Sequence, residues 1–283
     1  MAKQFKIGLV FGDGVPVEDV APGYEYLEIP LGNLMVPFQS EAVWQKTKNA
    51  LRSQSTLPMS VCSHFFNDPP GDVKNNIHFG LKVTGPDADP EQLEFWTKRA
   101  FKRCSDLGVA VAGVYGAFFP LPAGYSKKKA TDEAIKYLAM AARHAEAYNV
   151  LVALEPMADL GTLFPRYLEG IQLAKEVGSK TIRVMADLNY FLALEQPLED
   201  IAKEPGYCLH CHIQGDGGAQ PNVGNREKLF LRLFSIFKDI GYERGVSAAN
   251  PWKSTTSGPL DLKQETAITL SYMKKLRDQV YAR

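Results

Sequence analysis

The sequence is poor in cysteine and carries no excess charge of either sign. Its 283 residues include four cysteines, too few for a disulfide scaffold in a chain of this length, which favours a reducing compartment. Lysine and arginine together number 32, as do aspartate and glutamate, so the formal net charge is zero. A neutral chain has no general attraction for polyanions, and we therefore expect no nucleic-acid partner.

Long apolar runs are also missing. The N-terminal segment MAKQFKIGLVFGDG has one short apolar run, broken by Gly8 and ended by Asp13, without the longer apolar core and cleavage site of a signal peptide. No stretch approaches the length of about 20 apolar residues that spans a bilayer. The prediction is a soluble cytoplasmic protein without a membrane partner.

Short apolar runs are present instead, each rich enough in β-branched or aromatic residues for a buried strand. They lie at residues 5–11, 24–31, 58–65, 109–115, 149–156, 181–188, 207–213 and 245–249. Helical patterns separate the later runs, and eight parallel strands alternating with helices close into a barrel. No Gly-x-Gly-x-x-Gly follows the first run, which disfavours a doubly wound open sheet. The prediction is a single (β/α)8 TIM barrel over residues 1–283.

The segment GYCLHCHIQGD, residues 206–216, contains Cys-x-x-Cys-His, the spacing of a c-type haem attachment site. Alternate residues of a strand face opposite ways. One face would therefore carry Cys208, His210, His212 and Gln214, and the other Leu209, Cys211 and Ile213. With the two thiols on opposite faces we interpret their spacing as incidental, and the polar set as facing the barrel interior.

Polar residues end three consecutive predicted strands. Glu155, Asp187 and His212 lie there, and the carboxyl ends of the strands carry the active sites of such barrels. Two carboxylates and one imidazole suit a divalent cation such as Mn²⁺, Mg²⁺, Co²⁺ or Zn²⁺, and three ligands leave positions open for substrate, as in catalytic sites. Each acid alone could equally be a helix cap or an ion-pair partner, but a common height on neighbouring strands favours the metal.

Other residues at or near strand ends are candidates for contact with a substrate. They are Glu28, His64, Phe119, Tyr190, His210 and Trp252. Aromatic rings can line a sugar pocket, although core packing or a dimer contact is the alternative for them, and a structural role is the alternative for Glu28 and His64. The sequence thus allows a homo-oligomer without requiring one.

Four segments resemble one known family. ALEPMADLGT, VGSKTIRVMADLNYF, CLHCHIQGD and GYERGVSAANPW resemble the xylose isomerase-like TIM-barrel superfamily, in its sugar isomerase and epimerase branch, most strongly over residues 130–252. The resemblance implies a metal held by a Glu after strand 5, an Asp after strand 6, a His on strand 7 and a Glu after strand 8, with the two Glu moving the proton. Glu155, Asp187 and His212 match the first three, so Glu155 would be both ligand and base.

The sequence departs from that family at the barrel mouth. Ala249 stands where the strand-8 Glu is usual, and Tyr190 where the family has a His three residues after the Asp. The Arg that commonly follows the strand-7 His is missing from GDGGAQPN, residues 215–222. Two-base epimerisation would lack its second carboxylate, while two carboxylates and a neutral imidazole still balance a 2+ ion.

The resemblance implies a divalent-metal-dependent isomerase or epimerase with an altered proton relay. Its substrate would be a small polyhydroxylated molecule, namely a sugar, keto-sugar or cyclitol, reacting through an enediolate-type intermediate. A related lyase or dehydratase, or a ligand-binding barrel with a degraded site, is the alternative. An endonuclease IV-like nuclease is disfavoured, because the chain has five histidines and no net positive charge.

Overall fold

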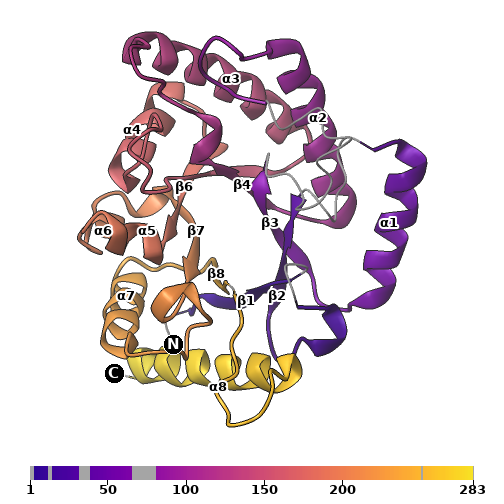
Figure 1. Ribbon diagram of the computed structural model, residues 1–283, viewed down its shortest axis with the longest axis vertical. Coiled ribbons are helices and arrows are strands. Elements are labelled where there is room, and N and C mark those ends of the chain that lie inside the picture. The colour runs from indigo at the N-terminus through magenta and orange to yellow at the C-terminus, as the bar shows by residue number, and fades with distance from the viewer. Residues whose placement is uncertain (1–2, 12–14, 32–38, 66–80, 250, 283) are drawn as a thin grey trace.

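The predicted barrel is present in the computed structural model, which describes residues 3–11, 15–31, 39–65, 81–249 and 251–282, without the side chains of 64 and 65. Eight parallel strands pair in chain order and close on themselves (Figure 1). They are β1 (Lys6–Val10), β2 (Tyr26–Pro30), β3 (Met59–Phe65), β4 (Val111–Tyr115), β5 (Leu151–Glu155), β6 (Ile182–Asp187), β7 (Cys208–Ile213) and β8 (Gly245–Ala248). Each lies within one of the predicted runs.

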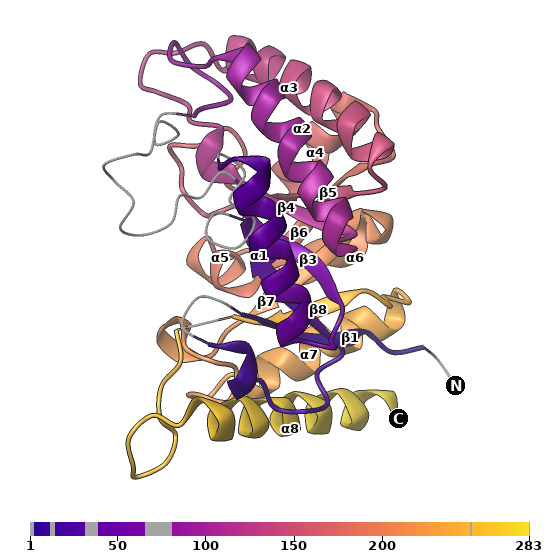
Figure 2. The same cartoon turned by 90° about the vertical axis from the view of Figure 1, so that its right-hand side faces the viewer.

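Helices surround the strands, because their apolar faces cover the outside of the barrel (Figure 1). They are α1 (Glu41–Gln54), α2 (Pro90–Leu107), α3 (Lys127–Ala147), α4 (Tyr167–Val177), α5 (Leu188–Ala193), α6 (Asp200–Lys203), α7 (Glu227–Asp239) and α8 (Leu262–Tyr281). In the side view α1 crosses in front of the strands and α8 runs along the lower edge (Figure 2). Among the described residues, none of the helices combines the length and apolar character needed to cross a bilayer.

A β-bulge changes which residues of β7 face the interior. Val184 of β6 pairs with Cys208, but the next residue, Met185, pairs with His210, so Leu209 is an extra residue in the strand. Leu209 packs with Met185 in the interior cluster, whereas Cys208 faces Tyr167 of α4 in the outer layer. The sequence prediction was therefore wrong for Cys208 and Leu209, because strict alternation does not hold across a bulge.

Tyr26, the first residue of β2, fills the barrel interior at the amino-terminal end of the strands. Its ring lies directly over two glycines, where a Cβ on Gly8 would come 2.1 Å from Tyr26 Cζ and one on Gly245 would come 2.4 Å from the Tyr26 hydroxyl. The hydroxyl itself lies 2.8 Å from Ser247 Oγ. This part of the interior is thus a packed core.

Gly8→Ala is expected to lower the free energy of unfolding by about 1–3 kcal/mol, because the new methyl group would overlap a ring that cannot move in a packed interior. Chemical denaturation measures the effect. The matched control is Gly206→Ala, where nothing lies within 4 Å of the new Cβ. Equal unfolding free energies for the two variants would contradict the packing described for Tyr26.

Candidate metal centre at the barrel mouth

The structure brings Glu155, Asp187 and His212 together at the carboxyl ends of β5, β6 and β7. Asp187 and His212 are direct neighbours in the β6–β7 register. Nδ1 of His212 lies 3.7 Å from Glu155 Oε1 and 3.5 Å from Asp187 Oδ2. All three side chains are buried, and one ligand atom from each lies within 4.8 Å of the others. The donor set is two carboxylates and an imidazole, which suits a divalent cation.

Asp187 is held in place by two further contacts. It is the N-cap of α5, and its Oδ1 accepts the backbone N–H of Asn189 at 2.8 Å. Its Oδ2 accepts from the side-chain amide of Gln214 at 2.8 Å. Asp187 is therefore a helix cap, one of the alternatives weighed from the sequence. The cap does not remove Asp187 from the cluster, because it fixes the carboxylate with Oδ2 toward His212.

The other nitrogen of His212 is occupied. Nε2 lies 2.7 Å from Oε1 of Glu28, so it donates its hydrogen to that carboxylate. A neutral ring then has its lone pair on Nδ1, facing two carboxylate oxygens, an arrangement that requires a proton or a cation between them. Glu155 Oε2 is buried and has no hydrogen-bond partner among the described residues. Both observations fit the divalent cation that the donor set suits.

The electrostatics of the cluster follow from burial and close charges. Burial raises the pKa of Glu155 to about 8; His212 opposes this rise, and Asp187 and Glu28 add to it. Burial alone would lower the pKa of His212, but Glu28 and Asp187 outweigh it and raise that pKa well above its usual value. Burial alone would raise the pKa of Glu28, but His212 and His210 hold it well below its usual value. Without a metal ion, bound protons thus offset the negative charge of the carboxylates, and a bound cation would displace these protons.

A cavity of 230 Å³ opens over these three side chains. Its described lining comprises Val10, Tyr115, Glu155, Asp187, Asn189, Tyr190, His212, Gln214 and Ala249. The hydroxyls of Tyr115 and Tyr190 lie 3.1 Å apart. Sequence reasoning identified Tyr190 but missed Tyr115 and Asn189. Tyr115 ends β4 and pairs in register with Glu155, so its strand-end position was the signal that could have found it.

Other predicted substrate contacts lie elsewhere. Phe119 is fully buried and packs against Tyr137 and Phe164 in the outer core, so it is a packing residue, contrary to the prediction. Trp252 also belongs to that core. The side chain of His64, on β3, lies outside the described residues.

Glu28 and His210 were also predicted to contact a substrate. Neither is among the described residues that line the cavity. They are instead bonded to each other, with Nε2 of His210 2.7 Å from Glu28 Oε2, and both are buried. Their side chains belong to the support of the site rather than to its open surface.

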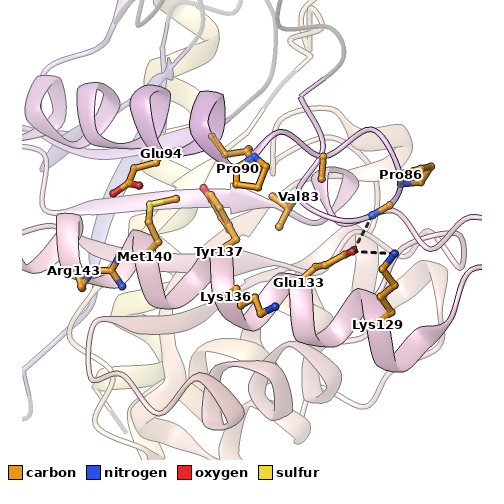
Figure 3. Close-up of a pocket in the computed structure, with 13 residues that line it drawn as sticks. Val83, Pro86, Pro90, Glu94, Lys129, Glu133, Lys136, Tyr137, Met140 and Arg143 are labelled. Atoms are coloured by element: carbon orange, nitrogen blue, oxygen red, sulfur yellow. Dashed lines mark hydrogen bonds and ion pairs between the residues drawn. The ribbon is translucent and has the colours of Figure 1, made fainter.

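A larger hollow of 510 Å³ lies on the outside of the barrel, between α2 and α3 (Figure 3). The carboxylate of Glu133 there accepts the backbone N–H of Gly85 at 3.0 Å and pairs with Lys129 at 3.9 Å. Within the described part of the chain, both groups able to hold a metal ion lie in the barrel and neither reaches this hollow. The candidate metal-binding residues therefore lie at the smaller cavity and not at this hollow.

Several solved structures share this fold at low sequence identity. A D-psicose 3-epimerase from Clostridium cellulolyticum H10 is 18% identical, with 96% of this chain and 99% of that chain covered and a TM-score of 0.74. A D-tagatose 3-epimerase-like protein is 16% identical over 98% and 99% of the two chains, with a TM-score of 0.72. A family 2 AP endonuclease from Brucella melitensis is 18% identical over 95% and 99%, with a TM-score of 0.68.

The sequence comparisons identify the family without naming an activity. No curated protein matches the chain. The family model described as xylose isomerase-like TIM barrel matches residues 20–276. The chain therefore belongs to the xylose isomerase-like TIM barrel family.

Proposed function

We propose that this chain is a divalent-metal-dependent isomerase or epimerase that acts on a small sugar, keto-sugar or cyclitol. The observation that carries the proposal is Nδ1 of His212 facing Glu155 Oε1 and Asp187 Oδ2 at 3.7 and 3.5 Å beneath the cavity at the barrel mouth. The names of the similar structures, which include psicose and tagatose 3-epimerases, support the same class of reaction.

The ligands of the cation would be Glu155, Asp187 and His212. A divalent cation there would supply Lewis acidity, which stabilises the negative charge of an enediolate-type intermediate. Glu155 would take the proton from the carbon beside the carbonyl group. Burial of this carboxylate excludes bulk water from the transferred proton.

The two tyrosines of the cavity would bind substrate oxygens. Burial raises the pKa of Tyr115 to about 12 and that of Tyr190 well above its usual value, so both hydroxyls keep their protons at neutral pH and can donate hydrogen bonds. No lysine or arginine is among the described lining residues. The lining therefore favours an uncharged polyhydroxylated substrate over a sugar phosphate.

Among the described residues that line the cavity, the acids lie on one side. In a closed ring of eight strands β5, which carries Glu155, lies opposite β1, and the β1 and β8 sides contribute Val10 and Ala249. Two apolar side chains cannot return a proton to the second face of a substrate. Proton transfer on a single face, as in isomerisation or in elimination by a lyase or dehydratase, is therefore favoured over two-base epimerisation.

The metal is the first test of this proposal. After dialysis against Mn²⁺ and then metal-free buffer, the protein is expected to retain about one ion per chain by elemental analysis, as a three-ligand catalytic site would. Asp187→Asn is expected to lose it. Asp200→Asn, which changes a buried aspartate paired with Lys203 outside the site, is the control and should retain the ion.

Solvent exchange then tests the reaction. The metal-loaded protein is incubated with a panel of ketoses in heavy water, and deuterium is expected at the carbon beside the carbonyl group of at least one of them. Retention of the metal without any exchange would favour a ligand-binding barrel, the alternative that the missing carboxylate at Ala249 supports.

A further inference from the structure

Glu28 is a buried carboxylate that does not touch the cavity. It lies in the middle of β2, between Val10 of β1 and Val61 of β3, and its side chain is 0% exposed. A charge at such a position is costly unless it is paired and hydrogen-bonded. Both of its oxygens are engaged by imidazoles, Oε2 by His210 and Oε1 by His212, each at 2.7 Å.

These contacts decide how the ring of His212 is protonated. An ionised carboxylate only accepts hydrogen bonds, so Nε2 of His212 must be the nitrogen that carries the hydrogen. In the neutral ring Nδ1 is then the unprotonated nitrogen, and it is the one that faces Glu155 and Asp187. A carboxylate behind a histidine ligand fixes both the tautomer and the direction of the ring in this way.

We infer that Glu28 is a positioning residue, which holds His212 so that Nδ1 presents its lone pair to a divalent cation between Glu155 and Asp187. The inference rests on the proposed metal site and assigns a role outside its ligands. Glu28 reaches His212 from β2, a strand that pairs with neither neighbour of β7. The closed ring of strands is therefore what brings the two residues together.

His210 keeps Glu28 from turning. It binds the second oxygen of the carboxylate, and its Nε2 also lies 3.2 Å from Ser247 Oγ, which in turn contacts the Tyr26 hydroxyl at 2.8 Å. The rings of His210 and His212 meet edge to face, at 88°. The support of the metal site thus continues as a chain of buried polar contacts into the packed amino-terminal end of the barrel interior.

A second cation held by Glu28, His210 and His212 is the competing interpretation, since one atom from each lies within 4.8 Å of the others. The two 2.7 Å distances from the imidazoles to Glu28 argue against it, because at this distance nitrogen and oxygen form direct N–H···O hydrogen bonds, with no cation between them. Stoichiometry separates the two interpretations: the inference requires one Mn²⁺ per chain, and two ions per chain would overturn it.

Glu28→Gln tests the positioning role. The glutamine amide has nearly the shape of the carboxylate, but one end accepts and the other donates, so it cannot accept from both imidazoles. The Kd for Mn²⁺, measured by the EPR signal of the free ion, is expected to rise about 10- to 100-fold. Glu265→Gln is the control, a buried glutamate held by Thr255 and Gln220 outside the site, and its Kd should match that of wild type.

The wild-type chain provides a measurement that needs no variant. In the ¹⁵N–¹H spectrum of the protein loaded with Zn²⁺, a diamagnetic divalent ion, His212 should carry its hydrogen on Nε2 and bind the ion through Nδ1. Hydrogen on Nδ1, or a Glu28→Gln chain that binds Mn²⁺ as tightly as wild type, would overturn the role of Glu28. A wild-type chain that binds no Mn²⁺ would overturn the proposed function itself.

Discussion

Glu155→Gln is expected to lower kcat by about 10²- to 10⁴-fold, the range over which a positioned general base contributes. The amide has nearly the shape of the carboxylate but cannot accept the proton, so Km should change much less than kcat. The measurement is the rate of deuterium exchange into the substrate with saturating Mn²⁺, so that any weaker binding of the metal by the amide oxygen is overcome.

Glu265→Gln serves as the control for that experiment also, because the same chemical change occurs at a glutamate that is 1% exposed, like Glu155 itself. Its exchange rate should equal that of wild type. If the two variants exchanged at the same rate, Glu155 would not be the base, and the proton would have to move through another group of the cavity.

Ala249→Glu is expected to tighten metal binding, because Ala249 lines the cavity on the side where no described lining residue is a carboxylate. At an effective dielectric constant of about 20, a charge about 4 Å from a unit charge gains roughly 4 kcal/mol. Desolvation of the new carboxylate opposes much of this. The net gain in affinity should be about 10- to 100-fold, since each 1.4 kcal/mol is a factor of ten.

The same variant should also acquire a second acid for the opposite face of a substrate, and hence some epimerisation. Chromatography of the products of a ketose after long incubation measures it. Ala249→Gln is the matched control, with similar size and no charge, and should gain neither affinity nor epimerase activity. Tighter binding by the glutamine variant would mean that filling the cavity, and not charge, produced the effect.

The strands, and the convergence of Glu155, Asp187 and His212, could be predicted from the sequence because both depend on where each strand begins and ends. Each apolar run became a strand, and in a parallel barrel the strand ends gather at one rim. Glu155, Asp187 and His212 each sit at such an end. This part of the site required only the strand boundaries.

The remainder depends on packing that local patterns do not encode. Nothing in the run YCLHCHI marks Leu209 as an extra residue, so alternation gave the wrong face for Cys208. Phe119 follows β4 past a short 3-10 turn, Gly116–Phe118, that directs it into the outer core. The contact between Glu28 and His212 joins residues 184 positions apart, and only closure of the ring brings them together.

The bulge in β7 also bears on which metals the barrel would take up. With the thiols of Cys208 and Cys211 both packed toward the helices, the two candidate metal-binding groups among the described residues offer oxygen and nitrogen atoms alone. Thiophilic ions such as Cu⁺ would find no cysteine thiolate in either of these groups, whereas ions that prefer carboxylate and imidazole would find their usual partners. The extra residue Leu209 thus keeps the thiol of Cys208 apart from the proposed metal site.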